Sequence, residues 1–174
     1  MQQYIDRPYQ PKYKIRLFEF LLTFSVWVGL TWSLEPFSLF FGILVALVGV
    51  LLLWDLFPPN MALLFTPKRI LALLLYAPYF IYCVIHANLD VAYRVLHPDM
   101  PIKPGIVKVK TTLKTDLAKT FLANSITLTP GTLTVDIDGE YLYIHWIYVI
   151  SEDMDKATKI IVSRFEYFLR RIFE

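Results

Sequence analysis

The sequence predicts a membrane-helical N-terminal part, a helical hairpin plus a third long helix, followed by a small soluble α+β domain. Two observations lead to this prediction. Residues 17–97 are dominated by long apolar and aromatic runs, whereas the chain after residue 104 changes to short alternating runs and amphipathic helices. The mean hydropathy of +0.50 therefore averages two unlike halves. We expect four regions: an interfacial tail (1–16), a membrane domain (17–97), a linker (98–104) and a soluble α+β domain (105–174).

The tail and the first two apolar segments predict a hairpin anchored in the membrane. The tail is basic and rich in tyrosine, which suits the headgroup region on the cytoplasmic side. Helices are expected over about 17–34 and 37–57. Only Glu35 and Pro36 separate them, and proline disfavours helix in the residue before it but suits the first turn of the next helix.

Small residues recur along one face of the second expected helix. They are Gly42, Ala46 and Gly49. Small residues let two helix backbones approach closely in a membrane. This spacing therefore predicts close packing in the hairpin.

The third expected helix, 68–97, is apolar over Ile70–Ala87 and amphipathic beyond it. If it crosses the membrane, the lysines from Lys103 onward lie opposite the basic tail, an arrangement that the positive-inside rule hardly favours. If it is re-entrant, tilted or interfacial, every basic region lies inside. Pro78, flanked by tyrosines, is compatible with a bent or shallow helix. Both arrangements stay open, and we expect a cytoplasmic C-terminal domain.

The soluble domain is expected in the order β-α-β-β-α, as a two-layer unit with its helices on one face of the sheet. The expected elements are a strand over 106–113, a helix over 116–127 capped by Thr115 or Asp116, strands over 132–136 and 141–146, and a helix over 153–173. Between the last two strands, Asp138-Gly139 is a strong hairpin signal.

Asn124–Thr132, with the sequence NSITLTPGT, is the densest group of special residues. Its hydroxyls can cap the end of a helix, and Pro130-Gly131 forces a turn before the next strand. Turn chemistry accounts for every residue in the stretch. A docking or ligand loop at the membrane surface is the functional alternative.

Four polar residues are possible membrane contacts: Glu19, His86, Asp90 and Arg94. Carboxylates inside a membrane are rare and functional. Glu19, one turn from Arg16, is not clearly central in its segment, so solvation at the interface is the preferred interpretation, and Glu19 is the best candidate for an exception. His86, Asp90 and Arg94 stand four residues apart, so the row could relay protons. An ion pair within the helix, Asp90 with Arg94, is the simpler explanation of the last two, and His86 remains a candidate for a pH-sensitive contact.

Other classes of function find little support in the sequence. No P-loop, dinucleotide fingerprint, zinc-protease motif or nucleophile elbow is present, so we expect neither an enzyme nor a bound cofactor. Cys83 is the only cysteine, which excludes a thiolate cluster, and no metal site is expected. A net charge of +2 without a dense basic stripe gives no reason to expect nucleic acid.

The run NSITLTPGTLTVDIDGEYLYIHWI, with the preceding ANLDVAYRVLHP and the oily N-terminal half, resembles the MrpE family of the Mrp (Mnh/Pha) multisubunit cation/proton antiporters. The resemblance covers nearly the whole chain. It implies an accessory, non-catalytic subunit of a Na⁺/H⁺ antiporter in the cell membrane, with other membrane subunits and the bilayer as partners. The residues that we expect to matter for assembly are Asn124, Thr129, Pro130 and Gly131. A free-standing membrane-anchored sensor is the alternative.

Overall fold

The computed structural model describes residues 12–53 and 66–174 and divides the chain into two compact units, Met1–Thr66 and Pro67–Glu174. Part of the expected tail and the end of the second expected helix lie outside the described residues. The third helix belongs by its contacts to the second unit, together with the α+β domain.

The first unit contains the expected hairpin, formed by α1 (Lys12–Thr31) and α2 (Pro36–Leu53). The Glu35 carbonyl accepts the Leu39 amide at 3.0 Å, so Pro36 occupies the first position of α2, as predicted. The expected end of α1 at residue 34 is wrong. Trp32 has a φ of +48°, which takes the chain out of the right-handed helix after Thr31.

The small residues of α2 face α1, which confirms the predicted close packing. A Cβ on Gly42 would lie 2.6 Å from Trp27 Cδ1, and one on Gly49 would lie 3.6 Å from Thr23 Cγ2. Ala46, between the two glycines, is completely buried. A larger side chain at position 42 would therefore push the helices apart.

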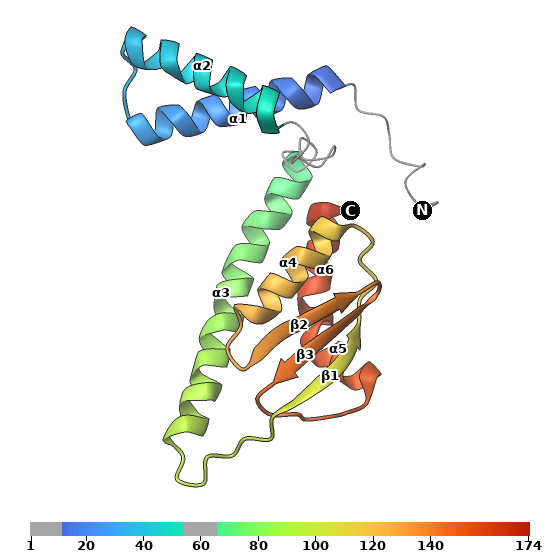
Figure 1. Ribbon diagram of the computed structural model, residues 1–174. Helices are drawn as coiled ribbons and strands as arrows, with labels where there is room; N and C mark the ends of the chain where they lie inside the picture. The colour runs from blue at the N-terminus through green and yellow to red at the C-terminus, as the bar shows by residue number, and fades with distance from the viewer. Residues whose placement is uncertain (1–11, 54–65) are drawn as a thin grey trace. The chain divides into compact units, whose positions relative to one another are not determined.

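The third helix, α3 (Pro67–Leu96), runs without interruption through Pro78 (Figure 1). Among the described residues it is the one helix both long and apolar enough to cross a bilayer, with a mean hydropathy of 1.9 in its most apolar window. The apolar stretch Pro36–Leu52 is shorter.

The rest of the second unit is an antiparallel sheet with helices on one face (Figure 1). The elements are β1 (Gly105–Lys110), α4 (Asp116–Thr127), β2 (Thr132–Asp138), β3 (Tyr141–Trp146), α5 (Met154–Ile161) and α6 (Ser163–Phe173). The strand order is β1-β3-β2, with Gly139 at a φ of +58° in the β2–β3 turn. The predicted hairpin is therefore confirmed, as is Thr115 as the cap of α4, since its side chain accepts from the Ala118 amide.

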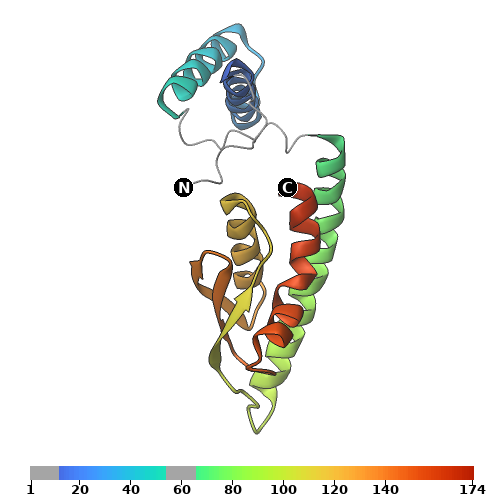
Figure 2. The ribbon, with the colours of Figure 1, turned by 90° about the vertical axis from the view of Figure 1, so that its right-hand side faces the viewer.

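The expectation of one final helix is wrong, because the chain breaks it at Val162 into α5 and α6. The two pieces meet different surfaces: α5 packs on β1, while α6 packs on α3 and α4. One straight helix could not follow both. Figure 2 shows the outcome, with α6 between the sheet and α3.

The core of this unit lies between the inner face of the sheet and the helices. Its largest fully buried side chains include Val109, Leu142 and Ile144 of the sheet and Leu122, Ile126, Phe165 and Leu169 of the helices. This core fixes α6, and α6 in turn presents its other side to α3.

Candidate interaction site along the long helix

Aromatic side chains join α3 to α6. Tyr76, Tyr79 and Phe80 of α3 contact Phe165 and Phe168 of α6, and this contact is called the aromatic seam here. The ring centroid of Phe168 lies 5.7 Å from that of Tyr76 and 5.0 Å from that of Tyr79. Phe80 and Phe165 have centroids 6.1 Å apart. Tilted aromatic pairs at such distances are attractive beyond the area they bury. The helices run antiparallel, and Arg69 donates to the Glu174 backbone carbonyl at 3.3 Å beyond the seam.

The seam lies within the stretch of α3 whose composition suggested a membrane segment. Tyr76 is 7% exposed and Cys83 is 7% exposed, and both face the domain. Lipid therefore cannot surround α3 on all sides over this stretch.

A buried hydrogen bond connects α3 with the NSITLTPGT stretch. The Tyr76 hydroxyl lies 2.5 Å from Ser125 Oγ, and Ser125 Oγ lies 2.7 Å from the Phe121 carbonyl. A carbonyl can only accept, so the serine uses its single proton there and Tyr76 donates to Ser125. The tyrosine hydroxyl is thus satisfied inside the interface.

Two further hydroxyls of the stretch, those of Thr129 and Thr132, cap the end of α4, as turn chemistry predicted. Thr129 Oγ1 donates to the Ser125 carbonyl at 2.8 Å, and Thr129 is 1% exposed. Thr132 Oγ1 donates to the Ile126 carbonyl at 2.7 Å. The first bond satisfies the Ser125 carbonyl, and the second adds to the bond that the Ile126 carbonyl accepts from the Thr129 amide at 3.2 Å.

Gly131 lies where the turn meets α3. Its φ is +91°, and a Cβ there would lie 3.1 Å from Ile147 Cγ2 and 3.5 Å from Val91 Cγ2. Pro130 beside it is half-buried, whereas Asn124 is exposed on α4. Of the four predicted residues, Thr129 is therefore buried at the end of α4, and Gly131 is the one whose surroundings include Val91 of α3.

The C-terminal half of α3 carries the predicted ion pair. Arg94 donates to both carboxylate oxygens of Asp90, at 2.8 and 3.0 Å, which confirms the pairing. Its guanidinium also donates to the Pro101 carbonyl at 2.9 Å and lies 4.2 Å from the centre of the Tyr148 ring. Arg94 therefore fastens the loop after α3 to the helix. His86, one turn earlier than Asp90, is exposed, with its ring against Tyr82.

Glu19 belongs to the hairpin of the first unit, whereas His86, Asp90 and Arg94 belong to α3 of the second. It is 2% exposed, and neither carboxylate oxygen has a hydrogen-bond partner among the described residues. In the same described part of the chain, no group of three or more His, Cys, Asp or Glu residues could hold a metal ion.

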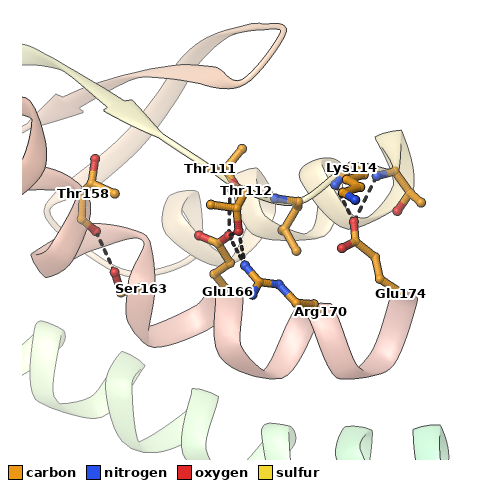
Figure 3. A network of polar contacts seen from close by, with 10 residues as sticks. Thr111, Thr112, Lys114, Thr158, Ser163, Glu166, Arg170 and Glu174 are labelled. Carbon is orange, nitrogen blue, oxygen red and sulfur yellow. Dashed lines mark hydrogen bonds and ion pairs between the residues drawn. The ribbon is translucent and has the colours of Figure 1, made fainter. Parts of the chain in front are cut away.

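A polar network that sequence reasoning missed holds α6 against the loop between β1 and α4 (Figure 3). Glu166 accepts from the Thr112 amide at 2.8 Å, from the Thr112 hydroxyl, and from Arg170 Nη2 at 2.9 Å. Glu174 accepts from the amides of Lys114 and Thr115. Glu166 and Arg170 are four residues apart on α6, but the groups that they and Glu174 bind on the loop lie more than fifty positions away, so no local motif marks the network. The aromatic seam left a fainter signal, namely rings three and four residues apart in α3 and three apart in α6.

The face of α3 turned away from the domain, here called the outer face, is apolar and uncovered. Its members, each more than half exposed, are Leu71, Leu74, Leu75, Ile81, Tyr82, Ile85 and Leu89. No charged residue occurs between Ile70 and Ile85. An exposed apolar surface of this extent marks a contact with lipid or with another protein.

An apolar hairpin, and a domain mounted on a helix with an exposed apolar face, are typical of a membrane protein. A model of the family described as "Na+/H+ ion antiporter subunit" matches residues 20–172. The chain belongs to this family.

Individual relatives support the assignment. The Na(+)/H(+) antiporter E subunit of Alkalihalophilus pseudofirmus is 43% identical over 112 residues, which are 63% of this chain and 68% of that protein. The E1 subunit of the Staphylococcus haemolyticus Na(+)/H(+) antiporter is 34% identical over 133 residues, 75% of this chain and 80% of that one. Among solved structures, a chain of the membrane-bound sulfane sulfur reductase, an archaeal respiratory membrane complex, is similar with 47% identity and a TM-score of 0.81. The match covers 91% of this chain and 99% of that chain.

Proposed function

We propose that this chain is an accessory, non-catalytic subunit of a multisubunit Na⁺/H⁺ antiporter in the cell membrane. The observation that carries the proposal is the family match, which spans residues 20–172 and so includes both the hairpin and the domain. The exposed apolar outer face of α3 is consistent with a place at the membrane.

A respiratory membrane complex is a second candidate for the host assembly. The similar chain of the archaeal sulfane sulfur reductase has higher identity and greater coverage than either antiporter relative described above. Both candidates give the chain the same part, that of a small subunit held among larger membrane proteins.

Purification of the complex distinguishes the candidates. The full chain, tagged at its C-terminus, would be isolated in mild detergent, and all co-purifying proteins identified by mass spectrometry. Antiporter-type membrane proteins in a stable ratio would support the first proposal, and additional redox subunits would support the second. Recovery of the chain alone, repeated in a gentler detergent, would refute both and favour the free-standing sensor.

For the membrane arrangement, we infer that α1 and α2 cross the bilayer and that α3 does not cross it as a separate span. If lipid surrounded α3, then α6 would enter the bilayer together with Arg170 and Glu174, at a high energetic cost. In addition, none of the 17 lysines and arginines lies between Leu17 and Pro67. Two crossings therefore put every basic residue on one side, as the positive-inside rule favours, and place the domain in the cytoplasm.

We assign the outer face of α3 to the cytoplasmic surface of the bilayer. The polar side of an interfacial helix normally faces water, and here the domain takes its place along the aromatic seam. The basic pair Lys68 and Arg69 at the start of α3 suits contact with anionic headgroups.

Cysteine labelling of intact cells tests this arrangement. With Cys83 replaced by alanine, a single cysteine would be placed at Ser33, in the turn of the hairpin, or at Asp138, in the β2–β3 hairpin. Two crossings predict that a membrane-impermeant maleimide labels the first variant on intact cells and the second only after lysis. Labelling of the second variant on intact cells would refute the two-crossing arrangement.

A further inference from the structure

Glu19 lies on the face of α1 that packs against α2. It precedes Thr23 and Trp27 by one and two helical turns, and these two residues contact Gly49 and Gly42 of α2. Residues four apart share a helix face, so Glu19 continues the same contact surface. Its side chain is 2% exposed, and both carboxylate oxygens lack a hydrogen-bond partner in the described part of the chain.

Within the described residues of α1 and α2, the groups that could compensate a negative charge on Glu19 all lie on α1. From Pro36 to Leu53, α2 carries no titratable residue, and its one hydroxyl, that of Ser38, bonds near the opposite end of the hairpin. On α1 the cations are Lys12, Lys14 and Arg16. Arg16 interacts electrostatically with Glu19, but it gives the carboxylate no hydrogen bond.

An ionised carboxylate without hydrogen bonds in such a place is costly by several kcal/mol. The neutral acid avoids most of this cost. A cation from another subunit is a poor alternative, because a side chain that is 2% exposed offers almost no surface to a second chain.

We propose that Glu19 is a proton-binding site of the hairpin. The carboxyl group is a neutral acid while α1 and α2 are packed. When the two helices separate, its O–H bond breaks, the proton passes to water, and the carboxylate that remains is solvated. Proton release is thereby tied to opening of the hairpin. The inference rests on the proposed membrane position of α1 and α2.

A stability comparison on the full-length chain in detergent tests the proposal. Trp146 would be replaced by phenylalanine, so that every remaining tryptophan precedes Pro67 and fluorescence follows the hairpin. Glu19→Gln imitates the neutral acid and cannot ionise. Because the open state binds fewer protons, the unfolding midpoint of the chain with Glu19 should fall relative to that of Glu19→Gln as the pH is raised.

The opposite results are equally clear. A difference in midpoint that stays constant from mildly acidic to alkaline pH would overturn the proposal. So would a Glu19→Gln variant that is much less stable at every pH, since this would identify an ionised group with a partner. Neither result depends on which complex the chain joins, so failure here is distinguishable from failure of the proposed function.

Chemical labelling follows the same proton independently. A hydrophobic carbodiimide adds to protonated carboxyl groups in apolar places, and peptide mass spectrometry locates the adduct. Labelling of Glu19 should fall about tenfold for each pH unit above its midpoint. Glu35, exposed in the turn, and Asp90, paired with Arg94, serve as controls in the same chain. Equal labelling of Glu19 and Glu35 at every pH would count against the proposal.

Discussion

Replacement of Gly131 by alanine tests whether the NSITLTPGT turn joins the domain to the long helix. Gly131 has a φ of +91°, and its missing Cβ would meet Ile147 and Val91. Gly139 provides a matched control. It too has a positive φ, of +58°, but nothing lies within 4 Å of its missing Cβ. Both substitutions strain the backbone, and only Gly131→Ala also crowds the joint.

The magnitudes follow from these two contributions. The left-handed conformation costs a non-glycine residue about 1–2 kcal/mol. Inserting a methyl group into a closed contact costs about 1–3 kcal/mol more. Gly131→Ala should therefore destabilise the second unit by about 1–3 kcal/mol more than Gly139→Ala does. For a unit of this size, such a difference lowers the melting temperature by roughly 4–12 °C.

Thermal unfolding of the full chain in detergent measures this difference, and tagged purification measures the yield of the complex. We expect Gly131→Ala to reduce both, and Gly139→Ala to leave the yield near that of the unmodified chain. The amount of protein inserted in the membrane should be equal for the two variants, because neither touches the hairpin. If Gly131→Ala proves no more harmful than Gly139→Ala, the joint does not depend on this turn.

Three further predictions concern the two helix contacts and the network in Figure 3. Phe168→Ala should weaken the contact between α3 and α6 by about 1–3 kcal/mol, since Phe168 is half-buried. Faster thiol modification of the buried Cys83 would report this weakening, and an unchanged modification rate would contradict the seam's role. Gly42→Ala should lower the stability of the hairpin, which tryptophan fluorescence during unfolding would measure. Gly29→Ala is the control: its Cβ meets open space, so the change should be neutral or stabilising by up to ~1 kcal/mol. Glu166→Gln should cost about 1–3 kcal/mol in thermal unfolding because the carboxylate holds three donors, and an unchanged melting temperature would show that the network is not stabilising.

Local patterns in the sequence predicted much of this fold. The Asp138-Gly139 turn, the Thr115 cap and the small-residue face of α2 all depend on residues close together in the chain, and each is present in the structure. The break at Val162 could not be predicted in this way. The apolar spacing runs on through it, and the break arises because α5 and α6 pack on different partners.

The candidate site shows the same division between local and distant information. The hydroxyl caps around Thr129 and the pairing of Asp90 with Arg94 could be predicted, since donor and acceptor lie within a few residues of each other. The partner of Tyr76 could not, because Ser125 is 49 positions away. Composition alone also says little about what covers α3, since aromatic residues that pack against a domain are as apolar as residues that face lipid.

The order of synthesis gives the aromatic seam a further consequence. When α3 leaves the ribosome, α6 has not yet been made, so Tyr76 and Phe80 emerge without their cover. For that interval α3 offers the insertion machinery a helix as apolar as a true span. Whether α3 enters the membrane therefore depends on the relative rates of insertion and of folding of the C-terminal unit. Slow folding of that unit would favour a chain in which α3 has inserted as an additional crossing.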